Sequence, residues 1–329
     1  MKPPSLDLGA SHYGGAMIPN KAITLICGAV LLLSCGKKDN EPKPPGPDGL
    51  AELASKRQTY LELSELQQGE AGFLEEFHCD SLLFSALYAV SGGNVQIQAA
   101  RAESGQWFRT PAHDCFLRGK SDSTISKDML LGLAIWHWQF RDFEGVVDLI
   151  EYGKTHNWGI GWKMGDGVLD RVVLLPGSQA YWLEARYRMG GTNDPNRLFQ
   201  PGNGERTGFA RHLQTLGIFF RGLMAGGVTD KQLERLRLNA ASNLENAFYQ
   251  AAYHFYFDGD QTAAIEILLS ERYYPNRRLP TNRERCSPYP MQRDPGPDWE
   301  PCPNEALERY SGVGLIFTSA IILGKLRTI

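Results

Sequence analysis

The sequence predicts an all-α fold with long loops, and two observations carry that prediction. Apolar residues recur at helical spacing through most of the chain, whereas runs that alternate in the manner of strands are scarce. Several predicted helices are apolar on every side, so other helices must surround them. Only residues 95–98 and 172–175 have some strand character. We therefore expect strand in less than about a tenth of the residues, well below the usual share in globular proteins.

The first 34 residues predict a targeting signal that does not belong to the fold. Their apolar run, 22–33, is too short to span a bilayer as a helix. The run ends in Leu32-Leu33-Ser34-Cys35, which resembles the lipobox of bacterial lipoproteins. The resemblance implies cleavage before Cys35, lipid on that cysteine, and a membrane-anchored protein on the periplasmic or surface side of the bacterial cell envelope. An ordinary signal peptide is the alternative.

Residues 35–47 predict a spacer, because they are polar, charged and rich in proline. The remaining residues, 48–329, are enough for one large helical domain with a substantial core. A net charge of −3 gives no indication of nucleic-acid binding. The apolar residues 313–323 are too few to cross a membrane and predict a buried helix.

The individual helices are predicted from their apolar spacing and from their end signals. Gly190 and Gly226 follow the last apolar residues of two helices, where glycine is the usual stop. Thr229 with Gln232 predicts a capping box for the next helix, and Asn304 predicts an N-cap for the last. The predicted helices cover 51–66, 79–90, 126–140, 143–155, 176–189, 207–224, 229–243, 244–257 and 312–323.

This number of helices, several of them wholly buried, exceeds what a four-helix bundle can use. Two concentric layers would accommodate them, with buried helices inside and amphipathic helices outside. In this outline the chain resembles the (α/α) toroid of many secreted carbohydrate-active enzymes. The resemblance implies an (α/α) toroid-like double layer of helices and a polysaccharide as binding partner. A helical repeat or an irregular α domain would give a similar pattern.

Four cysteines remain once the signal is removed and Cys35 is assigned to lipid. An even number in an oxidising compartment favours disulfides. Among the three possible pairings we favour Cys79–Cys115 and Cys286–Cys302, which close the shortest loops. A metal site is the alternative, but the chain has no Cys-x-x-Cys, and we predict neither a metal nor another cofactor.

The first candidates for acid–base chemistry lie between two predicted helices. His113 and Asp114 form a titratable pair on a long loop, although a plain surface histidine is the alternative. Asp128 lies in the first turn of a predicted helix, where the helix dipole alone would also favour it. These three residues are predicted to be catalytic if the chain hydrolyses glycosidic bonds.

A second set of candidates fits a lyase. His156-Asn157 resembles a pair that helical-barrel polysaccharide lyases use, which implies that asparagine neutralises a uronate carboxyl and that histidine is the base. The alternative for Tyr256 is a core position, because an aromatic stripe at helical spacing is more often core than catalytic. The predicted catalytic residues of the lyase alternative are His156, His254 and Tyr256.

Aromatic and cationic residues of the same loops predict how a sugar chain is held. Exposed indoles offer an apolar face for stacking, and arginine forks pair with carboxylates. A core position is the alternative for the two tryptophans of 158–162, and the arginine-rich loop 272–293 is either a second anionic-ligand site or simply solvated. The predicted substrate-binding residues are Arg101, Trp107, Arg109, Trp158 and Trp162.

Together these features predict an envelope lipoprotein that degrades or binds a polysaccharide, either peptidoglycan or an acidic glycan, by hydrolase or lyase chemistry. The alternative is a non-catalytic envelope protein for binding or scaffolding, and the sequence identifies no protein partner. An enzyme should bring segments 107–128 and 156–166 to one concave pocket that carries at least two titratable side chains. Placement of these two segments on opposite faces of the protein would exclude the enzyme hypothesis.

Overall fold

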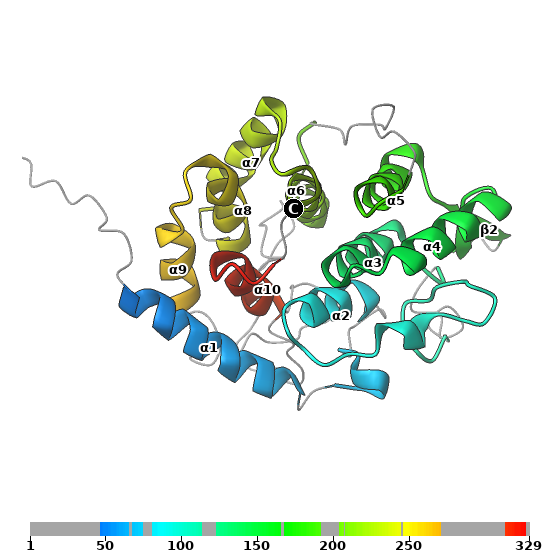
Figure 1. The fold of residues 1–329 in the computed structure, drawn as a ribbon, viewed down its shortest axis with the longest axis horizontal. Helices are drawn as coiled ribbons and strands as arrows, with labels where there is room; N and C mark the ends of the chain where they lie inside the picture. Colours follow the sequence, from blue (N-terminus) through cyan, green and yellow to red (C-terminus); the bar gives the residue numbers. More distant parts are fainter. Residues whose placement is uncertain are drawn as a thin grey trace, which may run out of the picture. The chain divides into compact units, whose positions relative to one another are not determined.

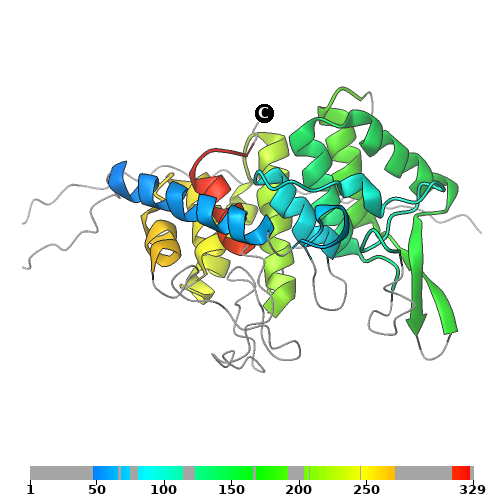
Figure 2. The same cartoon turned by 90° about the horizontal axis from the view of Figure 1, so that it is seen from below.

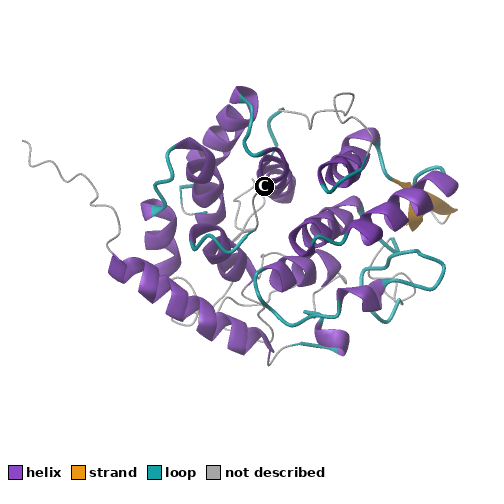
Figure 3. Ribbon diagram, viewed as in Figure 1, coloured by secondary structure: helices purple, strands orange, loops and turns teal. Residues whose placement is uncertain are grey.

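A computed structural model gives the fold and describes residues 47–65, 68–74, 81–113, 123–165, 168–191, 204–206, 208–244, 246–270 and 313–326. All of them belong to one compact unit of the chain, Pro42–Ile329. As predicted, this part of the chain is mainly helical (Figures 1 and 3). None of its helices has the length and apolar character needed to cross a membrane. The helices are α1 (Pro47–Glu65), η1 (Glu70–Gly72), α2 (Ser81–Val90), η3 (Ile97–Ala100), α3 (Lys127–Phe140), α4 (Phe143–Thr155), α5 (Pro176–Arg188), α6 (Gly208–Ala225), α7 (Asp230–Ser242), α8 (Ala247–Phe257), α9 (Thr262–Leu269) and α10 (Val313–Ile322).

The helix ends follow the signals in the sequence. Thr229 and Gln232 form the predicted capping box at the start of α7. Gly190 and Gly226 adopt left-handed φ angles of +118° and +74° just past α5 and α6, which confirms both glycine stops. The apolar pattern does not predict α9, because eight residues give barely two helical turns. Residues 95–98, which have strand character in the sequence, instead lead into η3.

The helices that are apolar on every side pack against one another. α2 is buried along its whole length and packs chiefly on α3. In turn α3 contacts α6, α6 contacts α8, α8 contacts α10, and α10 returns to α2. Gly132 allows the close α2–α3 approach, because a Cβ at that position would lie 2.8 Å from the Leu83 Cα. The amphipathic helices pack onto this set: α4 and α5 onto α3, α7 and α9 onto α8, and α1 onto α9 and α10.

Residues 157–177 lie between two predicted helices and are expected to form one of the long loops, but this expectation is wrong, because most of them form a β-hairpin. Strand β1 (Gly159–Gly165) pairs antiparallel with β2 (Val168–Val173), and Gly165 lies opposite Val168. The missed signal is Asp166-Gly167, the two residues between this pair, since Asp-Gly is a preferred two-residue hairpin connection. Figure 2 shows the hairpin extending away from the helices.

Candidate functional site

The two segments predicted to build a site lie side by side. The backbone N of Thr124 donates to the Trp162 carbonyl at 2.7 Å, and the Trp162 N donates to Thr124 Oγ1 at 2.9 Å. Arg109, buried in the neighbouring loop, donates from Nε to the Ser123 carbonyl at 3.0 Å. The described residues of segments 107–128 and 156–166 are therefore joined by hydrogen bonds, and β1 of the second segment contacts α4.

One face of α4 carries a row of polar and aromatic residues. Asp148, Tyr152 and His156 are four positions apart, so their side chains follow one another along the helix. Arg101 donates to Asp148 at 3.0 Å, and the Tyr152 ring stacks on His156 with 4.1 Å between ring centroids. Eight residues of helix place the two ends of this row about 12 Å apart.

A loop and the hairpin extend this row on its two sides. Gly105, with φ +85°, holds its loop so close to α4 that a Cβ there would lie 3.3 Å from the Tyr152 ring. The guanidinium of Arg171 in β2 donates to the His156 carbonyl. Arg171 lies opposite Trp162 in the hairpin register, so both side chains share one face, and Trp162 is 42% exposed. We define the α4 face as Arg101, Asp148, Tyr152, His156, Trp162 and Arg171.

Hydrogen bonding fixes the proton on the His156 ring. Its Nδ1 lies 2.8 Å from the Tyr152 carbonyl oxygen, which only accepts, so Nδ1 carries the hydrogen. In the neutral imidazole Nε2 is then free to accept a proton, and the side chain is exposed. Burial raises the pKa of Tyr152, and the nearby Arg171 only partly opposes this, so the phenol keeps its proton at neutral pH. The stack therefore pairs a proton acceptor with a proton donor.

A strained turn holds His156 at the end of α4. Asn157 and Trp158 both adopt left-handed backbone angles, φ 51° and 58°, which non-glycine residues rarely do in succession. The Trp158 ring packs so tightly on Gly153 that a Cβ there would lie 2.6 Å from it. Strain of this kind persists only where the surroundings impose it, and it is commonest at functional sites.

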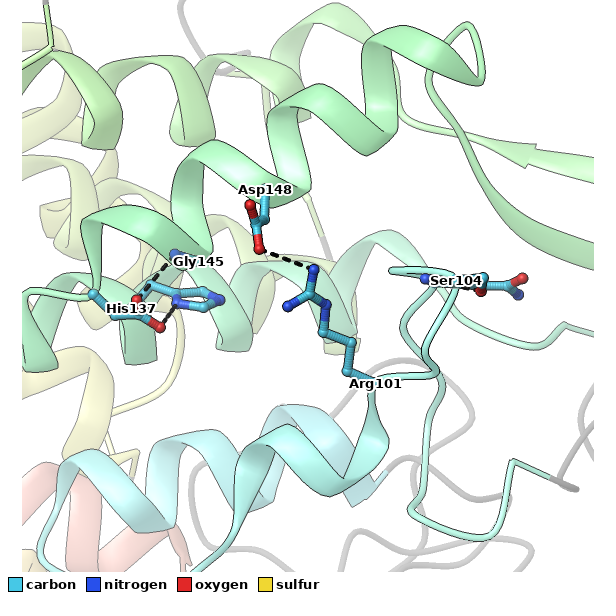
Figure 4. A network of polar contacts seen from close by, with 7 residues as sticks. Arg101, Ser104, His137, Gly145 and Asp148 are labelled. Atoms are coloured by element: carbon cyan, nitrogen blue, oxygen red, sulfur yellow. Dashed lines mark hydrogen bonds and ion pairs between the residues drawn. The ribbon is translucent and has the colours of Figure 1, made fainter.

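Beneath the start of α4 lies a buried histidine, shown in Figure 4. His137 is fully buried, and its Nδ1 lies 2.8 Å from Asp142 Oδ2, while Oδ1 of the same carboxylate caps α4 through the Gly145 N at 2.9 Å. The second ring nitrogen, Nε2, has no hydrogen-bond partner among the described residues and points to the side on which Arg101 lies. A side chain at Gly145 would collide with the imidazole. His137 thus ties α3 to the first turn of α4.

This histidine predicts a pH-dependent stability. Burial lowers the pKa of His137, although the hydrogen bond to Asp142 opposes that shift. Between neutral pH and about pH 5 the unfolded chain therefore binds a proton at position 137, near its usual pKa of about 6.5, that the folded chain does not bind. The free energy of unfolding should therefore decrease as the pH is lowered through this window, by at most about 1.4 kcal/mol per pH unit for this one group.

The measurement is chemical denaturation at half-unit steps from pH 7.5 to 5, for the native chain and for His137→Gln. Glutamine keeps a donor for Asp142 but does not titrate, so its curve should be flatter than the native one. Equal slopes for the two proteins would contradict the assignment. Asp142 does not interfere, because its pKa is lowered by the bond from His137 and its contribution is lost only in stronger acid.

The predicted binding residues have different surroundings. Arg101 and Trp162 belong to the α4 face, as does the predicted catalytic His156. Trp107 is a core residue, 5% exposed, whose ring lies edge-on to His137 with 6.0 Å between centroids. Trp158 is partly buried against the core. The core alternative, given above for Trp158 and Trp162, therefore fits Trp158 and not the 42% exposed Trp162, and Trp107 is buried in the core as well.

Two of the predicted hydrolase residues, His113 and Asp128, lie within the described ranges. His113 has φ 56° and stacks on Phe108 with 4.2 Å between centroids. Asp128 lies in the first turn of α3, and neither residue has an ion pair within the described ranges. Asp114 and the cysteines at 35, 79, 115, 286 and 302 lie outside the described residues.

His254 and Tyr256 lie on α8, which Figures 1 and 2 show on the opposite side of α6 from α4. His254 Nδ1 lies 2.8 Å from Asp258 Oδ1. The Tyr256 hydroxyl donates to the Phe219 carbonyl at 2.7 Å and lines a separate cavity. In the part of the chain that is described, no group of three or more His, Cys, Asp or Glu side chains could hold a metal ion.

Sequence reasoning missed Tyr152, Asp148 and the His137–Asp142 pair. The row on α4 could have been found from the sequence, because Asp148, Tyr152 and His156 are four positions apart. This spacing places them on one face of the correctly predicted helix. Comparisons of the chain with protein-family models, with curated proteins and with solved structures found no match.

Proposed function

We propose that this chain is an envelope lipoprotein that binds an acidic polysaccharide on the α4 face and cleaves it by β-elimination. The observation that carries the proposal is the His156–Tyr152 stack, an exposed proton acceptor against a protonated phenol, with Arg101 toward one end and Arg171 at the other. The Leu32-Leu33-Ser34-Cys35 sequence supports lipid anchoring at Cys35.

The two arginines suit a polymer that carries carboxylates along its length. A guanidinium has five N–H donors in a rigid fork. Arg101 shares its donors with Asp148, whose side chain is 52% exposed, so a ligand carboxylate can compete for them. Trp162 supplies an exposed indole beside Arg171 for the sugar ring.

The proposed reaction uses the stack as base and acid. Nε2 of His156 takes the proton on the carbon next to the uronate carboxyl group. The electrons of that C–H bond form a carbon–carbon double bond to the neighbouring ring carbon, whose bond to the glycosidic oxygen breaks. The Tyr152 hydroxyl gives its proton to this oxygen, and arginine neutralises the carboxylate. Such proton transfers contribute about 10²–10⁴-fold each.

Hydrolysis receives less support, because it requires two carboxyl groups. Asp148 is the one carboxylate of the α4 face, and it is paired with Arg101. Non-catalytic binding is the second candidate, favoured by the fact that both arginines already have acceptors within the protein.

For the architecture we propose a toroid-like double layer. The contacts that run from α2 through α3, α6, α8 and α10 back to α2 support an inner set of helices, and the packing of α1, α4, α5, α7 and α9 on that set supports an outer one. The Cys79–Cys115 and Cys286–Cys302 disulfides remain part of the proposal and are testable by peptide mapping without reduction.

Binding is tested by titrating the protein with polygalacturonate and with a neutral glucan of similar length. We expect saturable binding of the acidic polymer alone, weakened by salt because the contacts are charged. Arg101→Gln and Arg171→Gln should each weaken binding about tenfold, in line with hydrogen bonds to charged groups. The control is Arg237→Gln, an exposed arginine of α7 paired with Glu234. Equal binding of the neutral glucan would contradict the proposal.

A further inference from the structure

A second candidate ligand site lies where α6, α7 and α8 pack against one another, and Figure 1 shows these three helices. It is a cavity of about 480 Å³, within the size range of small-molecule sites. It stands across α6 from the α4 face, and nothing in the proposed function uses it. Its apolar wall is formed by Leu223, Val228, Leu233, Phe255 and Tyr256.

The rest of the lining is glycine, namely Gly222, Gly226 and Gly227. Gly222 lets the Tyr256 ring lie against α6, because a Cβ there would meet the ring carbon that bears the hydroxyl at 2.5 Å. Gly226 has φ +74°, which ends α6, and the Gly227 N donates to the Gly222 carbonyl at 2.9 Å. A Cβ at Gly226 or Gly227 would meet nothing within 4 Å. The cavity is therefore open where these two residues line it.

The lining determines the chemistry of a ligand. No ionisable acid or base other than the Tyr256 phenol lines the cavity among the described residues, and burial raises the pKa of that phenol. The Tyr256 hydrogen is committed to the Phe219 carbonyl, so its oxygen has only acceptor capacity to offer. An ion that entered would lose hydration without gaining a charged partner. All other polar atoms of the wall belong to the backbone.

We infer that this cavity binds a small uncharged molecule with an apolar ring or chain and a hydrogen-bond donor for the Tyr256 oxygen. The inference is independent of the polysaccharide site. Closely matched probes exist for it: N-phenyl-1-naphthylamine is uncharged and carries one N–H, and 1-anilinonaphthalene-8-sulfonate is the same ring system with an added sulfonate.

The experiment measures the fluorescence of both dyes with the exported chain carrying Cys35→Ser, which removes the predicted lipid. The uncharged dye should bind with one-to-one stoichiometry, and the sulfonated dye at least tenfold more weakly. Gly227→Phe should weaken binding of the uncharged dye at least tenfold, because its side chain enters open space, and Gly227→Leu should weaken it less. The matched control is Gly204→Phe, at another glycine where a Cβ meets nothing, and it should bind as the native chain does.

Circular dichroism and melting temperature establish that each variant is folded before the dyes are compared. The inference is overturned if the native chain does not bind the uncharged dye. It is equally overturned if both Gly227 variants bind as tightly as Gly204→Phe, or if the sulfonated dye binds as tightly as the uncharged one.

Discussion

Replacing Glu184 by alanine should destabilise the protein by about 3–5 kcal/mol, the usual cost of breaking a buried ion pair. Glu184 lies on α5 with its side chain 4% exposed. Its two carboxylate oxygens accept from Arg188 of the same helix at 3.1 Å and from Arg221 of α6 at 2.9 Å. Alanine would leave both guanidinium groups without that acceptor, and the Arg221 side chain is only 12% exposed.

The measurement is urea denaturation of the native chain and of the variant. Glu234→Ala is the matched control, because Glu234 also receives two hydrogen bonds from an arginine, Arg237, but at the exposed surface of α7. Exposed pairs contribute little, so the control should unfold at nearly the native midpoint. A similar midpoint for all three proteins would show that the α5–α6 contact does not depend on this carboxylate.

The largest expected effect on activity comes from His156→Ala. If His156 is the base of the elimination, its loss should lower kcat about 10²–10⁴-fold. Binding should change little, because the arginines and Trp162 remain. The fold should also persist, because the side chain is exposed and its Nδ1 has only local partners, the Tyr152 carbonyl at 2.8 Å and Thr155 Oγ1 at 3.0 Å. Tyr152→Phe, which removes only the hydroxyl, should likewise lower kcat with little change in KM.

His254→Ala provides the control. His254 also lies near the end of a helix with Nδ1 held by an acceptor, Asp258, but it belongs to α8. Its variant should cleave at the native rate. A loss of activity in His254→Ala as large as that in His156→Ala would contradict catalysis at the α4 face.

Much of the helical architecture follows directly from the chain. The apolar spacing predicts a helix over 143–155, and α4 covers these residues, with Asp142 capping its start in the structure. The Thr229–Gln232 capping box is equally local. Both depend on residues within four positions of one another, and such short-range preferences can be read without knowing the tertiary fold.

The candidate site, in contrast, depends on contacts between residues far apart in the sequence, and no local sequence pattern predicts these. Arg101 meets Asp148 across 47 positions, and Arg171 reaches the carbonyl of His156 only because residues 159–173 fold as a hairpin. His137 appears in the sequence as one polar residue in an apolar helix, and only the packing of α4 shows that Asp142 is its partner. Side chains from separate segments thus converge through tertiary packing, which helical periodicity does not predict.

The central claim is that the α4 face cleaves an acidic polysaccharide by elimination, and the product tests it most directly. Incubation of the protein with polygalacturonate should produce a steady rise in ultraviolet absorbance from the new carbon–carbon double bond, without a metal being added. The rise should be absent with His156→Ala and undiminished with His254→Ala. Polymer that binds but stays intact would contradict catalysis and favour the non-catalytic binding alternative. Shortened chains without the double bond would identify a hydrolase instead.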